Sequence, residues 1–230
     1  MERRSTKTLA RTLNCGAHCA KVVLLAALFA PAFFASIQVA EKTRPATTSD
    51  VKVVAVLEKP RPKELVKIYS IVKSHRPDIT DSEIWNVAEV ILKESSKRKL
   101  DPLLVLALIR LESGFQYTPV SPSGARGIMQ IMPDTGKSLA KSLGREYGLR
   151  PSAFRPESLD DPLLNIQLGI YYLHGLKKQF RDLSVTLSAY NAGPAEIQNR
   201  LENDLELANE FAALVLDVYE RYKNAKHPRF

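Results

Sequence analysis

The feature that most constrains the fold is a stretch without a polar side chain, from Leu103 to Ile109. Asp101 and Pro102 come directly before it. This pair is typical of a helix start, because the carboxylate caps free N–H groups and proline has no N–H to satisfy at the first helical position. A helix that is apolar on every side has to be buried. We therefore expect a helix in the middle of the domain core.

Helical signals continue on both sides of this segment. Thr80 and Glu83 have the spacing of a capping box, and apolar residues follow at positions 84, 87, 88 and 91, on one face of a helix. A second Asp-Pro pair, Asp161-Pro162, opens a long helix. The other expected elements are a short helix from Asp134-Thr135 to Gly144, a loop over residues 145–158, a short helix from Ser184 to the Gly193-Pro194 break, and a last helix over residues 209–222. No alternating strand pattern appears after residue 58, so the sequence predicts an all-α fold.

The first forty residues have the charge order of a membrane anchor or an export signal. Residues 1–21 carry five Lys or Arg and one acid, and residues 22–40 carry no charge. A basic segment followed by an apolar one is shared by signal peptides and by anchors whose C-terminal side is exported. The apolar run approaches the roughly 20 residues that span a bilayer. Gln38 spoils a cleavage site after Ala40, so we favour an uncleaved transmembrane anchor over a cleaved signal.

The rest of the chain divides into a linker and one domain. Prolines and scattered charges mark residues 41–63 as the linker, and the helical pattern places the domain at residues 64–230. Both cysteines, Cys15 and Cys19, precede the apolar segment. The exported part therefore has no disulfide, and its core must be held by packing.

Composition and spacing argue against several kinds of site. The net charge of +8 is concentrated in part in residues 1–21, and no basic stripe is interleaved with aromatic residues. We therefore expect no nucleic-acid partner. His75, His174 and His227 do not have the spacing of metal ligands. We predict no metal and no cofactor.

Glu112 is the candidate catalytic residue. It ends the apolar helix, where Val105, Leu108 and Ile109 share its face and Arg110 lies about 200° away round the helix. Burial disfavours the carboxylate, and so does the negative end of the helix dipole. Both effects raise the pKa, and a value of roughly 6 would require only about 2–3 kcal/mol. From its position alone, however, Glu112 is more readily interpreted as a structural residue turned towards solvent.

The motifs around Glu112 resemble those of the soluble lytic transglycosylases. They are Glu112-Ser113-x-Phe115, the run from Ser121-Pro122-x-Gly124-Ala125 to Gly127-Ile128-Met129-Gln130-Ile131-Met132-Pro133, Asp161-Pro162-x-x-Asn165-Ile166 with Gly169-x-Tyr171-Tyr172-Leu173, and Ala189-Tyr190-Asn191-Ala192-Gly193-Pro194. The resemblance covers roughly residues 80–222. It implies a lysozyme-like, goose-type helical fold and an enzyme that cleaves peptidoglycan glycan strands between N-acetylmuramic acid and N-acetylglucosamine.

The resemblance also implies the mechanism. Glu112 protonates the bridging oxygen, the acetamido carbonyl of muramic acid stabilises the developing oxocarbenium ion, and Glu112 then deprotonates the C6 hydroxyl. The hydroxyl closes on C1 to give a 1,6-anhydro ring, and no water is consumed. A hydrolase with two carboxylates would need a second acid, and none stands out in the sequence.

Five further residues match positions of this family that form the substrate site: Ser121, Gln130, Met132, Tyr190 and Asn191. Ser121, Gln130 and Met132 match positions that contact the sugar or orient the acid, and Tyr190 matches a tyrosine that points at the catalytic glutamate. Without the resemblance, Met132 and Tyr190 would be interpreted as core residues. The segment before the last helix lacks the Pro-x-Thr-x-x-Tyr sequence of many members, which puts substrate contacts from that region in doubt.

Three alternatives stay open from the sequence. A goose-type lysozyme would hydrolyse the same bond, and a peptidoglycan-binding module would keep the fold without cleavage. The enzyme could also serve a larger assembly of the cell envelope or a secretion system. In each case the domain is expected on the periplasmic side of the bacterial inner membrane, anchored by residues 22–40, or free in the periplasm if that segment is removed.

Overall fold

The computed structural model describes residues 62–225, and these form eight α-helices and two short 3₁₀ helices, with no strand among them. The basic N-terminus, the apolar segment and nearly all of the predicted linker lie outside the described residues. The elements are α1 (Lys63–His75), α2 (Asp81–Lys97), α3 (Pro102–Glu112), α4 (Pro133–Tyr147), η1 (Pro151–Ala153), η2 (Pro156–Asp160), α5 (Pro162–Phe180), α6 (Leu183–Ala192), α7 (Pro194–Glu202) and α8 (Glu210–Asn224). The prediction of an all-α fold is confirmed for this part of the chain.

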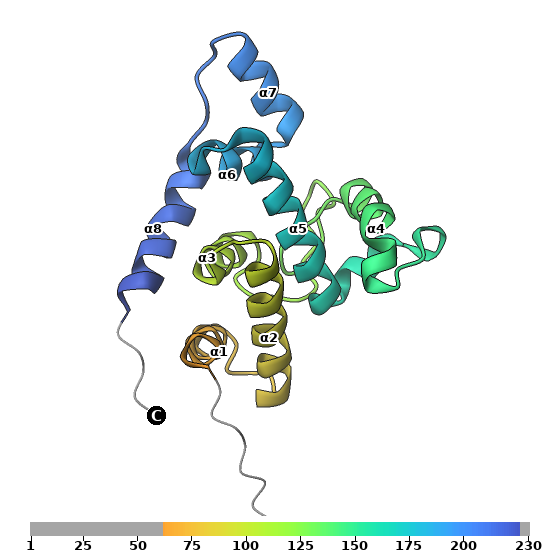
Figure 1. Cartoon of the computed structure of the whole chain (residues 1–230), viewed down its shortest axis with the longest axis vertical. Helices are drawn as coiled ribbons and strands as arrows, with labels where there is room; N and C mark the ends of the chain where they lie inside the picture. The colour runs from red at the N-terminus through yellow and green to blue at the C-terminus, as the bar shows by residue number, and fades with distance from the viewer. Residues whose placement is uncertain (1–61, 226–230) are drawn as a thin grey trace, which may run out of the picture. The chain divides into compact units, whose positions relative to one another are not determined.

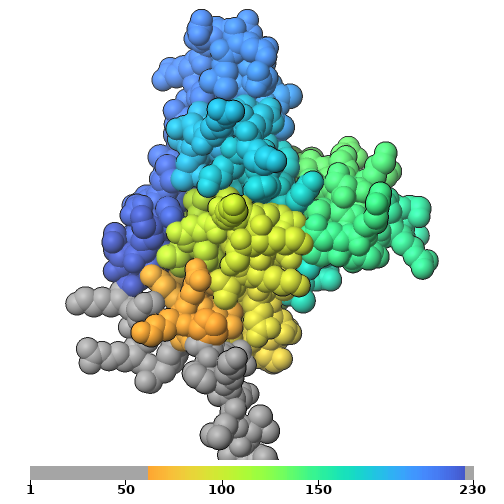
Figure 2. Space-filling model, viewed as in Figure 1, coloured from red at the N-terminus to blue at the C-terminus, as the bar shows by residue number. Residues whose placement is uncertain are grey.

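The apolar helix α3 lies in the core as expected. Residues 104–109 are all buried, and α3 packs against α1, α2 and α8 (Figure 1). The long helix α5 packs against α2, α4 and α6. In Figure 2 the yellow-green surface of the central region lies between the dark blue of α8 and the green of the α4 region. Glu112 is the last residue of α3, and its side chain is half-buried.

The predicted helix starts are confirmed at three positions. Thr80 and Glu83 form the reciprocal capping box of α2. The Asp101 carboxylate accepts the N–H of Leu103 at 2.8 Å, and the Asp161 carboxylate accepts that of Leu163 at 2.9 Å. These caps satisfy N–H groups that have no partner within the helix.

Three predicted boundaries were wrong. Helix α6 begins at Leu183 because Asp182, and not Ser184, accepts the N–H of Val185 at 2.9 Å. Helix α4 begins at Pro133, with Met132 as its uncapped N-terminal neighbour, and passes through Gly144 to Tyr147. It ends at Gly148, whose φ of 65° is the left-handed conformation that favours glycine. The predicted loop over residues 145–158 therefore contains the end of α4, η1 and most of η2.

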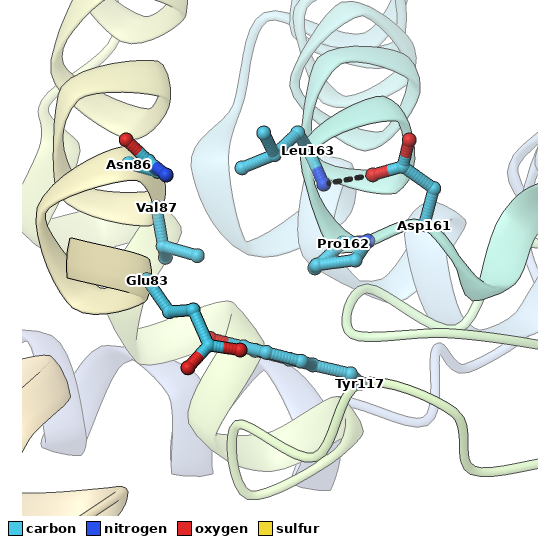
Figure 3. A pocket seen from close by; sticks show the side chains of 7 residues that line it. All are labelled: Glu83, Asn86, Val87, Tyr117, Asp161, Pro162 and Leu163. Carbon is cyan, nitrogen blue, oxygen red and sulfur yellow. Dashed lines mark hydrogen bonds between the residues drawn. The ribbon is translucent and has the colours of Figure 1, made fainter. Parts of the chain in front are cut away.

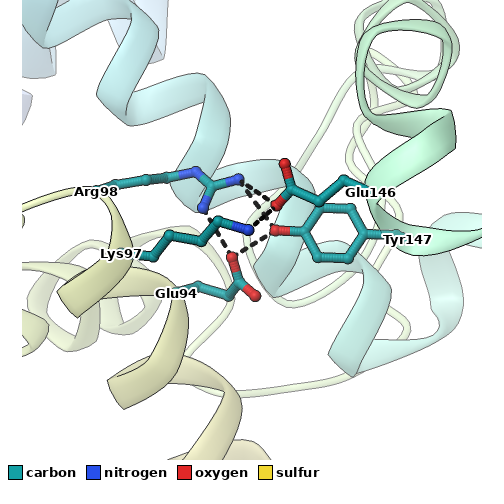
Figure 4. Close-up of polar contacts among 5 residues, drawn as sticks. All are labelled: Glu94, Lys97, Arg98, Glu146 and Tyr147. Atoms are coloured by element: carbon teal, nitrogen blue, oxygen red, sulfur yellow. Dashed lines mark hydrogen bonds and ion pairs between the residues drawn. The ribbon is translucent and has the colours of Figure 1, made fainter.

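A buried ionic network holds α4 against α2 (Figure 4). Arg98 donates to the Glu94 carboxylate at 2.8 Å, and the Tyr147 hydroxyl donates to the same oxygen at 2.5 Å. Lys97 and Arg98 both pair with Glu146. Because Glu94 is fully buried and Arg98 only 6% exposed, removing one partner would leave an uncompensated charge in the core.

Among the described residues no helix is long and apolar enough to cross a membrane. Residues 22–40, which the sequence predicts as the anchor, are not among them.

Candidate active site

Glu112 ends α3 with a half-buried side chain. Burial raises the pKa of Glu112 to about 8, which confirms the predicted direction and exceeds the value expected from the sequence. The charge of Arg110 acts on other groups. Burial and then the Arg110 charge lower the pKa of His75, whereas burial raises the pKa of Tyr222 to about 12 and the Arg110 charge opposes this rise. Within residues 62–225 burial is the one resolved cause of the rise at Glu112, and no second carboxylate contributes to it. The site therefore contains a carboxyl group that stays protonated at neutral pH.

Tyr190 interacts electrostatically with this carboxyl group. Its hydroxyl donates to the carbonyl of Met129 at 2.9 Å, and its ring is tilted against Tyr172 at 5.3 Å between ring centres. Burial raises the pKa of Tyr190 well above its usual value, and the charges of Glu112 and Tyr172 raise it further. The hydroxyl thus stays protonated, and α6 holds the ring within the electrostatic reach of Glu112.

Asn165 on α5 positions the loop that carries the predicted substrate-site residues. Its side chain is fully buried; it accepts the N–H of Met129 at 2.8 Å and donates to the carbonyls of Arg126 and Leu159, each at 2.9 Å. Gly127 has a φ of 81°, and a Cβ there would lie 2.2 Å from the Asn165 amide nitrogen. Only glycine fits this approach of the loop to α5.

Gln130 adopts an uncommon backbone conformation at the end of this loop. Its φ is 47°, and its side-chain amide donates to the carbonyls of Pro119 and Gly127, each at 3.0 Å. The amide nitrogen therefore braces the loop, and the sugar contact expected of this residue stays a prediction. Left-handed conformations of residues other than glycine concentrate at functional sites, where the surroundings hold them.

A cavity of about 230 Å³ brings together four of the six predicted site residues. They are Gln130, Met132, Tyr190 and Asn191, and the remaining lining residues are Ile131, Thr135, Tyr172, Ala192, Gly193 and Pro194. Met132 is 43% exposed, so it forms a wall of the cavity and is not a core residue. Its neighbour Met129 is fully buried. The cavity thus contains polar and apolar groups in the mixture that small-molecule sites use for orientation and contact.

Ser121 and Glu112 do not line this cavity. The Ser121 hydroxyl accepts the N–H of Ala125 at 3.0 Å and closes a turn, so the structure places it in the framework of the loop. Glu112 is connected to the cavity through its electrostatic contact with Tyr190. The helix carrying Glu112 is joined to the loop through Ser113, whose hydroxyl donates to the carbonyl of Ile128 at 2.7 Å.

Asn165 and Tyr172 lie in the motifs that resemble the family but were given no role in the site, and Thr135 was expected only at a helix start. Asn165 could also have been found because an asparagine within an apolar helix face requires hydrogen-bond partners. Thr135 had no signal for the site, since only the packing of α4 brings it to the cavity.

A second cavity, of about 290 Å³, lies between α2 and the start of α5 (Figure 3). Two carboxylates line it, but both already cap helices: Glu83 accepts from Thr80 at 2.7 Å, and Asp161 accepts from Leu163. Tyr117 closes one side of this cavity. The geometry assigns the two acids to helix capping, so the cavity next to Tyr190 is the better candidate for the chemistry. Among residues 62–225 no group of three or more His, Cys, Asp or Glu could hold a metal ion.

Comparison with known proteins gives a consistent result. A family described as "Transglycosylase SLT domain" matches residues 89–211. The chain is 30% identical over 172 residues to the membrane-bound lytic murein transglycosylase C of Shigella sonnei. This alignment covers 70% of this chain and 46% of that protein. The chain is also 33% identical over 116 residues to the soluble lytic murein transglycosylase of Escherichia coli K12. This alignment covers 50% of this chain and 17% of that protein.

A solved structure shares the fold. The crystal structure of the 70 kDa soluble lytic transglycosylase of Escherichia coli matches 71% of this chain and 30% of its own, with a TM-score of 0.50 and 24% identity. This likeness concerns the helical fold alone. The chain spans less than half the length of the curated relatives that it matches.

Proposed function

Because the chain belongs to the transglycosylase SLT domain family, we propose that it is a lytic transglycosylase that cleaves the glycan strands of peptidoglycan. In this proposal Glu112 is the catalytic acid and base, and Tyr190, Gln130, Met132 and Asn191 form the substrate site. The single observation that carries it is the pKa of Glu112, which burial raises to about 8 without a contribution from a second carboxylate among the described residues.

The protonation state of Glu112 suits the first step. At neutral pH a carboxylic acid with this pKa carries its proton and can donate it to the glycosidic oxygen as the bond to C1 breaks. Donation leaves a carboxylate in a half-buried site, where burial favours its return to the acid. It then takes the proton of the C6 hydroxyl while that oxygen bonds to C1. The proton given in the first step is recovered in the second, and the product ends in a 1,6-anhydro ring.

In this proposal Tyr190, which lines the cavity, helps to keep the site in place during both proton transfers. Its hydroxyl is committed to the Met129 carbonyl, so its ring is held in one orientation beside Glu112. Met132 and Asn191 offer an apolar wall and an amide to a sugar in the same cavity. For Ser121 we propose a supporting role in the loop, because its hydroxyl is used in the turn.

The test of the proposal compares wild type with Glu112→Gln on purified sacculi. Mass spectrometry of the soluble products should show anhydro-muramoyl ends for the wild type and none for the variant, while both bind sacculi. Glu83→Gln is the matched control, because Glu83 caps α2 and should be dispensable for cleavage. Reducing ends from the wild type would indicate a lysozyme-type hydrolase. Undiminished cleavage by Glu112→Gln would refute the role of Glu112, and binding without cleavage by the wild type would indicate a binding module.

We further propose that residues 22–40 anchor the protein in the inner membrane and that residues 41–63 connect the anchor to a periplasmic domain. The charge order of residues 1–40 supports this proposal, and the membrane-bound relative agrees with it. Fractionation of cells that produce the full chain and a chain lacking residues 1–40 provides the test. Recovery of both forms in the soluble fraction would contradict it.

A further inference from the structure

The chain directly after Glu112 turns through two left-handed residues. Gly114 has a φ of 59° and Phe115 a φ of 69°. Glycine adopts this conformation freely, but a residue with a bulky side chain does so only where its surroundings hold it. Contacts from outside this turn must therefore maintain its conformation.

These contacts come from the end of α1. The side chain of Phe115 is fully buried, and its ring is stacked on that of His75, with 4.7 Å between ring centres and 9° between the planes. The Arg76 guanidinium donates to the carbonyl of Phe115 at 2.9 Å. His75 in turn lies with its Nε2 2.9 Å from the hydroxyl of Tyr222 on α8. The turn is thus held through both its ring and its backbone.

The Arg76 guanidinium is also held by contacts outside the turn. Nε and Nη2 donate to the two carboxylate oxygens of Asp78 at 2.8 and 2.9 Å, which leaves Nη1 for Phe115. The guanidinium carbon lies 4.6 Å from the centre of the Tyr117 ring, which also borders the cavity of Figure 3. Arg76 is only 7% exposed, and all three nitrogens of its guanidinium group are used in these hydrogen bonds. Lysine could not reproduce this set of parallel donors.

We propose that Arg76 is a positioning residue for Glu112: by holding the Phe115 carbonyl, it fixes the left-handed turn that ends α3 and thereby the direction of the catalytic carboxyl group. The inference rests on the proposed function. Ser113, between the acid and the turn, donates to the carbonyl of Ile128, so the end of α3 has a second hydrogen bond besides that of Arg76. Arg76 precedes the family match at residues 89–211, whereas Phe115 lies within it.

The test uses three variants of the full-length chain. Arg76→Met keeps the length of the side chain without its donors, and Arg76→Lys keeps the charge. Arg98→Met is the matched control, because Arg98 is 6% exposed and pairs with Glu94 and Glu146 in the network of Figure 4. Release of soluble muropeptides gives kcat and KM, urea unfolding gives stability, and hydrogen exchange reports opening at Phe115.

Arg76→Met should lower kcat about 10- to 100-fold with little change in KM, because small displacements of a catalytic group have effects of this size. Arg76→Lys should recover part of the loss. Arg98→Met should lose stability but keep kcat within about twofold of the wild type at a temperature where all variants are folded. If Arg76→Met keeps the kcat of the control variant, the inference is refuted.

A readout without turnover separates this inference from the proposed function. The Phe115 amide should exchange faster in Arg76→Met than in Arg98→Met, and the pKa of Glu112, followed by carbon NMR of its carboxyl group, should fall towards its usual value as water reaches it. Unchanged exchange and an unchanged pKa would refute the inference even if the wild type cleaves nothing. If Arg76→Met does not fold, Asp78→Asn, which removes the partner that orients Arg76, provides the same comparison.

Discussion

Replacing Glu112 by glutamine is expected to stabilise the protein at alkaline pH while it abolishes cleavage. Burial holds the pKa of Glu112 at about 8 in the folded chain, whereas the ordinary value of 4.5 applies when the chain is unfolded. Between these two values the folded state keeps a proton that the unfolded state has lost. The free energy of unfolding therefore falls as the pH rises through this interval. Glutamine has nearly the same shape and does not titrate, so the free energy of unfolding of the variant does not fall in this way.

The size of the effect follows from the two pKa values. The loss is about 1.4 kcal/mol per pH unit, which gives a ceiling of about 5 kcal/mol between pH 4.5 and pH 8. Because Glu112 is only half-buried, solvent screening reduces this figure, and we expect about half of it. Below pH 4.5 both states are protonated, and above pH 8 both are ionised, so the difference between wild type and variant is constant outside the interval.

Urea unfolding at several pH values from 4 to 9 measures this difference. The stability of Glu112→Gln relative to the wild type should grow through the interval. Glu146→Gln is the control with the opposite sign, because the hydrogen bond from Lys97 lowers the pKa of Glu146 to about 2. The contribution of Glu146 is present above its ordinary pKa and is lost as the pH falls towards 2, so that variant should be less stable than the wild type at neutral pH. Parallel curves for wild type and Glu112→Gln would refute a raised pKa at Glu112.

Two further predictions concern the framework of the site. Asn165→Ala should lower the free energy of unfolding by about 3 kcal/mol or more, because it leaves the Met129 N–H and the carbonyls of Arg126 and Leu159 without their partner. Urea unfolding measures this loss. A change below about 1 kcal/mol would contradict the role of Asn165. Tyr190→Phe removes the hydrogen bond to Met129 and should reduce stability by about 1 kcal/mol and lower kcat, as unfolding and product release would show. Unchanged kcat would mean that the ring alone is sufficient beside Glu112.

The sequence predicted the elements of the domain well because their signals are local. A capping box, two Asp-Pro pairs and the Gly-Pro break each act within one helical turn, and the structure has helix boundaries at all of them. The errors were also local in origin. Asp182 and Ser184 are both good N-caps, and only the packed structure decides between them. Gly144 looked like a helix end, but Gly148 supplies the left-handed residue.

The candidate site was predicted from sequence only in part. Four residues that match the family motifs line one cavity, because the motif residues lie on segments that α5 and α6 bring together. Ser121 was expected at the substrate and closes a turn. Asn165 was given no role and makes three hydrogen bonds to the loop and its surroundings. Whether a polar side chain meets a substrate or the backbone depends on its neighbours in space, which the motif does not contain.

By itself the sequence determined that α3 would be buried and that Glu112 would lie on an apolar face at its C-terminal end, because hydrophobicity and helical periodicity are properties of contiguous residues. The tertiary structure alone decided how strongly the pKa of Glu112 is raised, since desolvation depends on every segment that packs around the carboxyl group. It also decided that α1, far away in the chain, would hold the turn after Glu112 through Arg76. A single hydrogen bond between residues 39 positions apart leaves no periodic signal in a sequence.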